Sequence, residues 1–177
     1  MVNGESTQKF KHSKEYYTQQ LNHIYEDTKF FFKLLEDRKI INDCSHVLDI
    51  GCGGGSKTIH FSQRYPGINT IGVDYQESII ELAKQLAQQS SSDNTSFKAW
   101  DWFNLPPEAY NKFDLIFSFH ALCCFKDPEE PLQKLIDLNP KSIIIKSLFY
   151  DAPLDVLIHI RDDKHGVADD DHDGDFN

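Results

Sequence analysis

The sequence is poor in the residues that build nucleic-acid and membrane contacts. It has three arginines, Arg38, Arg64 and Arg161, and no run of basic residues interleaved with aromatic ones. Surfaces that bind DNA or RNA are built from such clusters, so this scarcity argues against a nucleic-acid partner. No stretch of about 20 apolar residues occurs, which argues against a membrane-spanning helix. We therefore expect neither nucleic acid nor a membrane among the partners.

Cysteine is also scarce, and its spacing is uninformative for metals. The four cysteines form no C-x-x-C pair and do not recur at the spacing of a disulfide framework. They are Cys44, Cys52, Cys123 and Cys124. This pattern does not indicate zinc and favours reduced thiols. The N-terminus lacks the apolar run behind a basic start that marks a secretory signal, so the sequence predicts a cytoplasmic protein.

Negative charge is plentiful but unevenly distributed. The 177 residues carry a formal net charge of −10, of which residues 162–177 supply −6 through seven Asp and one Lys. Part of this tail, Asp169-x-Asp171-x-Asp173-Gly174, resembles the start of a calcium-binding EF-hand loop. The sequence stops before the twelfth loop position, which favours a solvated acidic segment instead. The remaining residues are nearly balanced in charge and long enough for one domain with a sizeable core.

Short apolar runs alternate with segments of helical spacing between residues 45 and 150. The runs are continuously apolar, as in strands covered on both faces of a sheet. Strands that alternate with helices predict a doubly wound α/β fold with a mostly parallel sheet of about five strands, which binds ligands at the carboxyl ends of its strands. The expected strands are 46–50, 69–73, 95–99, 113–119 and 142–149, and the expected helical segments are 10–39, 56–65, 77–89, 128–138 and 151–161.

A glycine-rich loop follows the first expected strand, in the sequence Asp49-Ile50-Gly51-Cys52-Gly53-Gly54-Gly55-Ser56. A loop that binds nucleoside triphosphates needs a second glycine where Ser56 stands, and Asp49 would place a carboxylate beside the phosphates. A dinucleotide-binding loop needs its third glycine at that same position. A nicotinamide-dependent oxidoreductase therefore remains as a weaker alternative.

The spacing Asp49-x-Gly51-x-Gly53-x-Gly55 resembles the first motif of class I S-adenosylmethionine-dependent methyltransferases. The methyl donor of that family is a sulfonium with an ammonium group and no phosphate, so a nearby carboxylate favours its binding. The resemblance implies that S-adenosyl-L-methionine is the cofactor. It also implies that Asp49, Gly51, Gly53 and Gly55 contact it, together with Cys52 in the same loop.

Two further motifs of the family occur at the expected distances. Asp74 ends the second strand and is predicted to accept the ribose hydroxyls, with capping of the next helix as the alternative. Tyr75 is expected to lie against the adenine. By the resemblance, Asp101 accepts the adenine amino group and the backbone at Trp102 meets the ring. The alternative is that Asp101 is an ordinary loop residue and that Trp100 and Trp102 are core residues.

The fourth strand and the N-terminal segment complete the expected site. The resemblance places Ser118 and Phe119 beside the methionine part of the donor, and it makes His120 the candidate general base, because histidine titrates near neutral pH. The alternative is that His120 only forms a hydrogen bond to the donor or to other groups in the pocket wall. One of Tyr16 and Tyr17 is predicted to reach the donor, and Tyr17 is the candidate; core packing is an alternative of at least equal weight for either. Asp114, at the strand start, is interpreted as structural.

These motifs predict a methyltransferase that transfers a methyl group to a small-molecule acceptor by direct displacement. A catalytically silent methyltransferase-like binding subunit is the alternative. The expected organisation is an N-terminal helical cap (1–40), a donor-binding domain (41–161) and an acidic tail (162–177). The C-terminal hairpin of the family sheet cannot be read after residue 149, and we interpret this as truncation.

Overall fold

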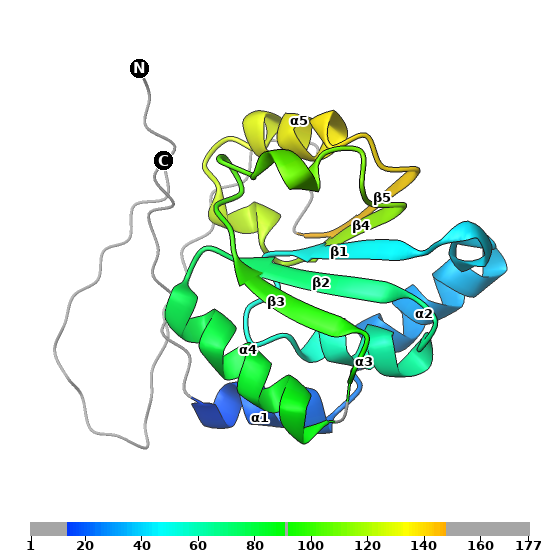
Figure 1. The fold of residues 1–177 in the computed structure, drawn as a ribbon, viewed down its shortest axis with the longest axis vertical. Coiled ribbons are helices and arrows are strands. Elements are labelled where there is room, and N and C mark those ends of the chain that lie inside the picture. Colours follow the sequence, from blue (N-terminus) through cyan, green and yellow to red (C-terminus); the bar gives the residue numbers. More distant parts are fainter. Residues whose placement is uncertain (1–13, 91, 148–177) are drawn as a thin grey trace, which may run out of the picture. The chain divides into compact units, whose positions relative to one another are not determined.

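Five parallel strands form the centre of the structure, a computed structural model that describes residues 14–90 and 92–147. The strand order is β3-β2-β1-β4-β5, and every neighbouring pair is parallel (Figure 1). Chain order reverses beside β1, where a doubly wound sheet binds its ligands. The predicted fold is therefore confirmed. The strands are β1 (His46–Ile50), β2 (Asn69–Asp74), β3 (Thr95–Ala99), β4 (Leu115–Phe119) and β5 (Ser142–Lys146).

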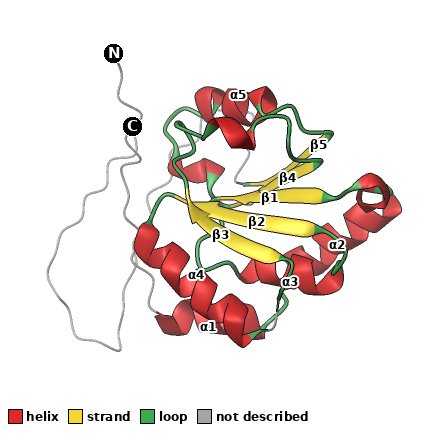
Figure 2. Ribbon diagram, in the orientation of Figure 1, coloured by secondary structure: helices red, strands yellow, loops and turns green. Residues whose placement is uncertain are grey.

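Helices cover both faces of the sheet (Figure 2). Side chains alternate between the two faces along a strand, so neighbouring residues enter different cores. Leu48 and Ile116 pack in a cluster with Leu135 of α5. Val47 joins a cluster on the other face with residues of α2 and α3, and a third cluster links α1, α3 and α4 to β3. The helices are α1 (Lys14–Asn22), α2 (Glu26–Asp37), α3 (Ser56–Arg64), α4 (Glu77–Gln89) and α5 (Glu129–Asp137).

The N-terminal helical segment is divided into two helices. The spacing predicts helix through 10–39, but α1 ends at Asn22 and α2 begins at Glu26. Tyr25 has extended backbone at the start of α2, and acidic residues fill the first turn. Acidic side chains favour a helix N-terminus because they complement its dipole, which accounts for a new helix starting there.

The start of β4 is held by Asp114. Its Oδ2 accepts hydrogen bonds from the amides of Ser45 (2.8 Å) and His46 (3.1 Å), and Oδ1 lies 2.7 Å from the Lys141 ammonium. The bond to Lys141 and the two amides lower the pKa of Asp114 to about 2. These contacts confirm its structural role and place the strand start at Leu115 rather than at residue 113.

Some predictions fall on residues outside the described ranges. They are the helix expected at 151–161, the acidic tail with its EF-hand-like stretch, and the final residues of the strand expected at 142–149. Within residues 14–90 and 92–147, no helix combines the length and apolar character needed to cross a membrane. Three short 3-10 helices were not predicted, at Ile40–Asp43, Pro107–Ala109 and Leu122–Cys124.

Candidate active site

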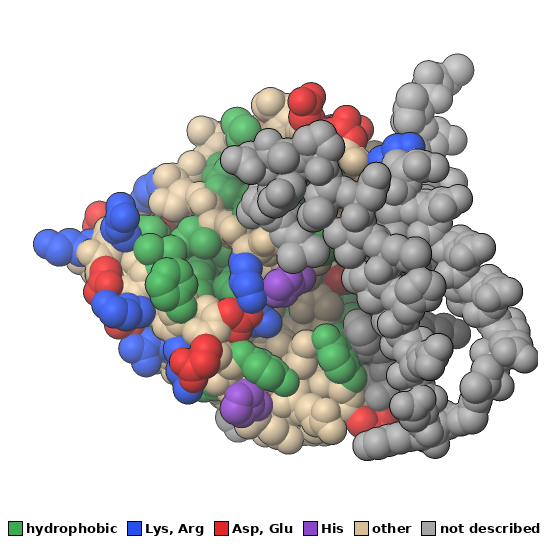
Figure 3. All heavy atoms as spheres, turned by 180° about the vertical axis from the view of Figure 1, so that it is seen from behind, with side chains coloured by type: hydrophobic (Ala, Val, Ile, Leu, Met, Phe, Trp, Pro, Cys, Tyr) green, Lys and Arg blue, Asp and Glu red, His purple; other side chains and the backbone are tan. Residues whose placement is uncertain are grey.

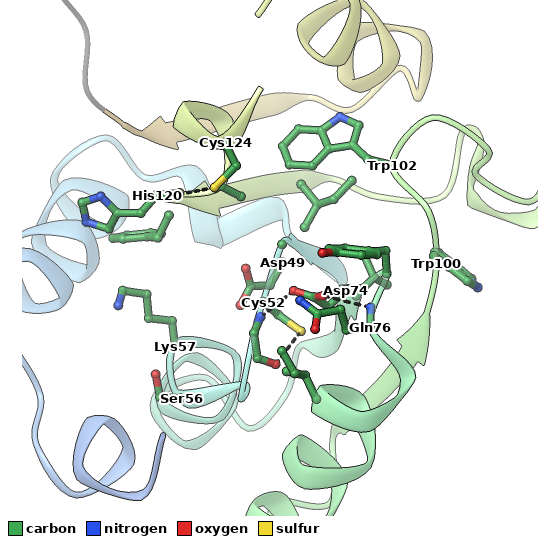
Figure 4. A pocket seen from close by; sticks show the side chains of 18 of the residues that line it. Asp49, Cys52, Ser56, Lys57, Asp74, Gln76, Trp100, Trp102, His120 and Cys124 are labelled. Carbon is green, nitrogen blue, oxygen red and sulfur yellow. Dashed lines mark hydrogen bonds between the residues drawn. The ribbon is translucent and has the colours of Figure 1, made fainter. Parts of the chain in front are cut away.

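A cavity of about 1200 Å³ opens at the carboxyl ends of β1, β2 and β4 (Figure 4). Its wall is continuous from α1, over the glycine loop, to the segments that follow β3 and β4. The carboxyl ends of parallel strands share one edge, so residues far apart in sequence meet there. Eleven of the predicted site residues line it: Tyr17, Asp49, Gly51, Cys52, Gly53, Asp74, Tyr75, Asp101, Trp102, Phe119 and His120.

The remaining two predicted site residues, Gly55 and Ser118, lie outside the lining. A Cβ at Gly55 would lie 2.5 Å from the ring of Phe97, so this glycine allows the loop to pack against β3. Ser118 is fully buried within β4. Their contacts with a methyl donor stay predictions.

The glycine loop is folded tightly against β2 and α1. The amides of Gly51 and Cys52 both donate to the Val73 carbonyl at 2.9 Å. Gly51 has a φ of +75°, and a Cβ there would lie 2.4 Å from the Cβ of Ala121. A Cβ at Gly54 would lie 2.3 Å from the Tyr17 ring. Close packing on both sides therefore requires glycine and leaves loop backbone facing the cavity.

Asp49 is a buried acid at the base of this loop. Only 2% of the residue is exposed, and its Oδ2 accepts a 2.6 Å hydrogen bond from the Thr58 hydroxyl. Burial raises the pKa of Asp49 to about 7, partly offset by the Thr58 bond and the positive charge of Lys57. At neutral pH the carboxyl is therefore poised between its two forms. A cation bound nearby would favour the carboxylate.

Asp74 faces the cavity and orders the turn before α4. The alternative prediction that it caps α4 is wrong, because the N-cap residue is Gln76 and no side-chain hydrogen bond caps that helix. The Oδ1 atom of Asp74 accepts a 3.1 Å bond from the amide of Gln76, which precedes α4, and its Oδ2 accepts a 3.1 Å bond from the amide of Gly53. Burial raises its pKa. An ionised carboxylate has about four acceptor sites, and the amides of Gln76, Gly53 and Tyr75 do not fill all of them. The same carboxylate thus orders the loop and offers acceptors to the cavity.

The two residues predicted at the exit of β3 point in different directions. Asp101 is exposed, and its oxygens accept bonds from the Phe103 amide (3.0 Å) and the Asn104 side chain (2.6 Å). The Trp102 ring is buried, with its Nε1 donating to the Pro131 carbonyl at 2.9 Å. The interpretation of Trp102 as a core residue is confirmed, and its backbone contact with a ligand stays a prediction.

Tyr17 packs in the core and also lines the cavity, and its contact with the donor stays a prediction. It is 6% exposed, packs in the cluster with α4, and lines the cavity above Gly53 and Gly54. Burial, followed by the negative charge of Asp74, raises its pKa to about 12. The hydroxyl therefore stays protonated over the physiological range.

His120 follows β4 directly and has a φ of +59°, a conformation rarely adopted by residues with a side chain. Its amide donates to the Lys146 carbonyl at 2.7 Å, and the Cys123 thiol donates to its carbonyl at 3.0 Å. These bonds hold the backbone that directs the imidazole to the cavity. Burial lowers the pKa of His120, and the charges of Lys146 and Lys57 lower it further. The imidazole is thus neutral near pH 7.

Lys57 is a lining residue that sequence reasoning missed. It follows the glycine motif in sequence, but its side chain lies against Phe119 at the end of β4. A local sequence pattern does not show such a long-range contact. The Lys57 ammonium lies 5.2 Å from the centre of the Phe119 ring. Nearby, the Lys146 ammonium pairs with Asp27 of α2 at 2.6 Å. Tyr16, the other tyrosine considered for contact with the donor, also lines the cavity. Other lining residues not predicted include Gln20, Gln76, Ile79, Cys124 and Phe125.

Comparison with known proteins identifies the family. A profile described as a methyltransferase domain matches residues 41–169. The release factor glutamine methyltransferase of Aliivibrio fischeri is 39% identical over 72 residues, which are 41% of this chain and 25% of that protein. A probable methyltransferase of Aspergillus luteorubrus is 29% identical over 130 residues, 66% of this chain and 46% of that protein. The chain thus spans less than half the length of these relatives.

A solved structure agrees with the sequence matches. The crystal structure of coclaurine N-methyltransferase bound to N-methylheliamine and SAH is 25% identical, with a TM-score of 0.54, covering 64% of this chain and 33% of that one. The strand order, the glycine loop and the profile match over most of the chain lead to the same assignment. The chain belongs to the class I S-adenosylmethionine-dependent methyltransferase family.

Proposed function

We propose that the protein binds S-adenosyl-L-methionine in this cavity and transfers its methyl group to a small-molecule acceptor by direct displacement. One observation carries the proposal. The glycine loop and three carboxyl groups, from Asp49, Asp74 and Asp101, line one cavity at the point where the chain order of the sheet reverses.

The chemistry of these groups fits the methyl donor. A sulfonium and an ammonium are cations, and carboxylates favour both, whereas they would repel the pyrophosphate of a nicotinamide cofactor. The tight glycine turn lets a ligand approach loop backbone closely. The acceptor capacity that remains on Asp74 suits the ribose hydroxyls. When bound, the donor supplies an electrophilic methyl group.

The protein positions the two reactants and supplies a proton acceptor. Holding two reactants in line can lower a barrier by up to about 7–11 kcal/mol. Phe119, the last residue of β4, and His120, the next residue, form one side of the cavity. The acceptor would meet the methyl group on this side. A neutral imidazole at His120 can accept the proton of an acceptor hydroxyl or amine. The segment after β3, at Asp101 and Trp102, would hold the adenine.

A small-molecule acceptor suits the cavity. Its volume of about 1200 Å³ exceeds that of a typical ligand pocket and leaves room beside the donor for a second small ligand. On the face shown in Figure 3, basic and acidic side chains of the described residues are interspersed rather than gathered in one basic patch. This supports the proposal that neither nucleic acid nor a membrane is a partner. A cytoplasmic location is part of the same proposal.

Calorimetric titration with S-adenosylhomocysteine, NADH and ATP tests the cofactor. We expect binding of the thioether alone. Asp74→Ala removes the proposed ribose acceptor and is expected to weaken binding at least tenfold, while Asp93→Ala, an exposed acid before β3, leaves it unchanged. Binding of NADH or ATP without the thioether would overturn the assignment. Tight thioether binding without methyl transfer to any compound of a broad acceptor panel would identify a silent binding subunit.

A further inference from the structure

Lys57 gives the cavity a positive charge that the binding of a nucleoside does not require. It stands in the first turn of α3, and it is the only Lys or Arg among the described residues that line the cavity. Figure 4 shows its side chain on the same side of the cavity as His120, away from Trp100. The ammonium faces the Phe119 ring at 5.2 Å.

The fold gains little from a lysine at this position. A cation in the first turn opposes the helix dipole at a cost of about 0.3–1 kcal/mol. The first turn of α3 contains no acidic residue, and none of the ion pairs in residues 14–90 and 92–147 includes Lys57. Its 5.2 Å contact with the Phe119 ring contributes about 0.5–1 kcal/mol, which only offsets the cost at the helix N-terminus. A local rule is therefore broken with little net structural gain, as expected at a functional position.

The neighbouring acids do not neutralise this charge. Asp27, which interacts electrostatically with Lys57, already forms its 2.6 Å pair with Lys146. Asp49 is buried, bonded to Thr58, and only partly ionised at neutral pH because burial raises its pKa. Among the described residues, the two lysines near the end of β4, Lys57 and Lys146, therefore share one fully ionised carboxylate. Within this part of the chain, the charge of Lys57 has no negative partner.

We propose that Lys57 selects a methyl acceptor that carries a carboxylate, which binds its ammonium while the nucleophile faces His120. The inference rests on the proposed function and names its substrate class. A carboxylate carries the single charge that one ammonium neutralises. The Phe119 ring beside Lys57 offers an apolar surface for the body of the acceptor. The competing partner for Lys57 is the carboxylate of the methyl donor itself, and the test separates the two.

Two matched ligand pairs provide the test: salicylate with salicylamide, and anthranilate with anthranilamide. Each is titrated calorimetrically into protein saturated with S-adenosylhomocysteine. We expect the wild type to bind at least one anion ten times more tightly than its neutral partner. Lys57→Met should abolish this preference, Lys57→Arg should retain it, and Lys84→Met, which removes an exposed lysine of α4, should leave it unchanged.

A second titration identifies the carboxylate that Lys57 binds. Methylthioadenosine lacks the amino-acid part of S-adenosylhomocysteine and therefore its carboxylate. If Lys57 binds the acceptor and not the donor, the ratio of the affinities for these two ligands should be the same in the wild type and in Lys57→Met. A tenfold loss for S-adenosylhomocysteine alone would assign Lys57 to the donor and overturn the inference. Wild-type protein with no preference for either anion would also overturn it. Failure of the wild type to bind S-adenosylhomocysteine would instead refute the proposed function.

Discussion

Replacing Asp49 by asparagine should stabilise the ligand-free protein and weaken it as a methyltransferase. Asp49 is buried beneath the glycine loop and accepts a 2.6 Å hydrogen bond from the Thr58 hydroxyl. An asparagine carbonyl can still accept that bond but carries no charge. The substitution thus removes the cost of a buried charge while keeping shape and hydrogen bonding.

The magnitude follows from the pKa of Asp49, which burial raises from 3.8 to about 7. Between these values the folded protein binds more protons than the unfolded chain, so stability falls as pH rises. Three pKa units at about 1.4 kcal/mol each cost the wild type up to about 4 kcal/mol above pH 7. Asp49→Asn escapes this cost. Its free energy of unfolding should exceed that of the wild type, with the gap growing from pH 4 to pH 7.

Urea denaturation of both proteins at about pH 5.5 and pH 8 measures the gap. We expect it to widen by about 2 kcal/mol between the two conditions. Asp101→Asn, at an exposed acid of the same cavity, is the control and should show no such widening. A gap that stays constant with pH would refute the buried-charge reasoning. Affinity for S-adenosylhomocysteine should fall at least tenfold in Asp49→Asn, because the carboxylate that favours its ammonium is lost.

Two further predictions concern the cavity wall and the candidate base. Gly54→Ala places a Cβ 2.3 Å from the Tyr17 ring and should lower the affinity for S-adenosylhomocysteine at least tenfold, as measured by calorimetry. Gly67→Ala is the control, because a Cβ there would have no atom within 4 Å, and it should leave the affinity unchanged. Equal affinities of the two variants would contradict the packing argument. His120→Asn keeps a residue that tolerates positive φ but removes the base. It should abolish the acid limb of kcat/KM, which we expect below pH 6.5 because burial lowers the pKa of His120, and an unchanged profile would exclude the base role.

The fold could be predicted because its signals are local. The apolar run at 46–50 and the helical spacing at 77–89 correspond to β1 and α4 residue for residue. The interruption between α1 and α2 was missed because aromatic residues continue through it at helical intervals. What divides the helices is the extended backbone at Tyr25, which the apolar pattern does not record.

The site was predictable to the extent that backbone position determines it. Asp49 lies one residue before the end of β1 and Asp74 ends the neighbouring parallel strand β2, so both had to lie near the same edge of the sheet. Side-chain direction was not predictable. Ser118 precedes two lining residues but is enclosed within the sheet, and Gly55 faces Phe97 instead of the cavity. Lys57 was missed for the same reason. Its ammonium lies over the ring of Phe119 at the end of β4, a contact between distant parts of the sequence.

The N-terminal helices belong to the site as much as the sheet does. Tyr17 of α1 covers the glycine loop, where the methyl donor is proposed to bind. Asp27 of α2 forms an ion pair with the Lys146 ammonium, and the carbonyl of Lys146 accepts a hydrogen bond from the His120 amide. One chain of contacts therefore runs from the cap to the backbone that presents the candidate base. The predicted boundary at residue 40 separates the cap from the donor-binding domain in sequence. Both sides of the cavity, however, depend on contacts from both of these stretches.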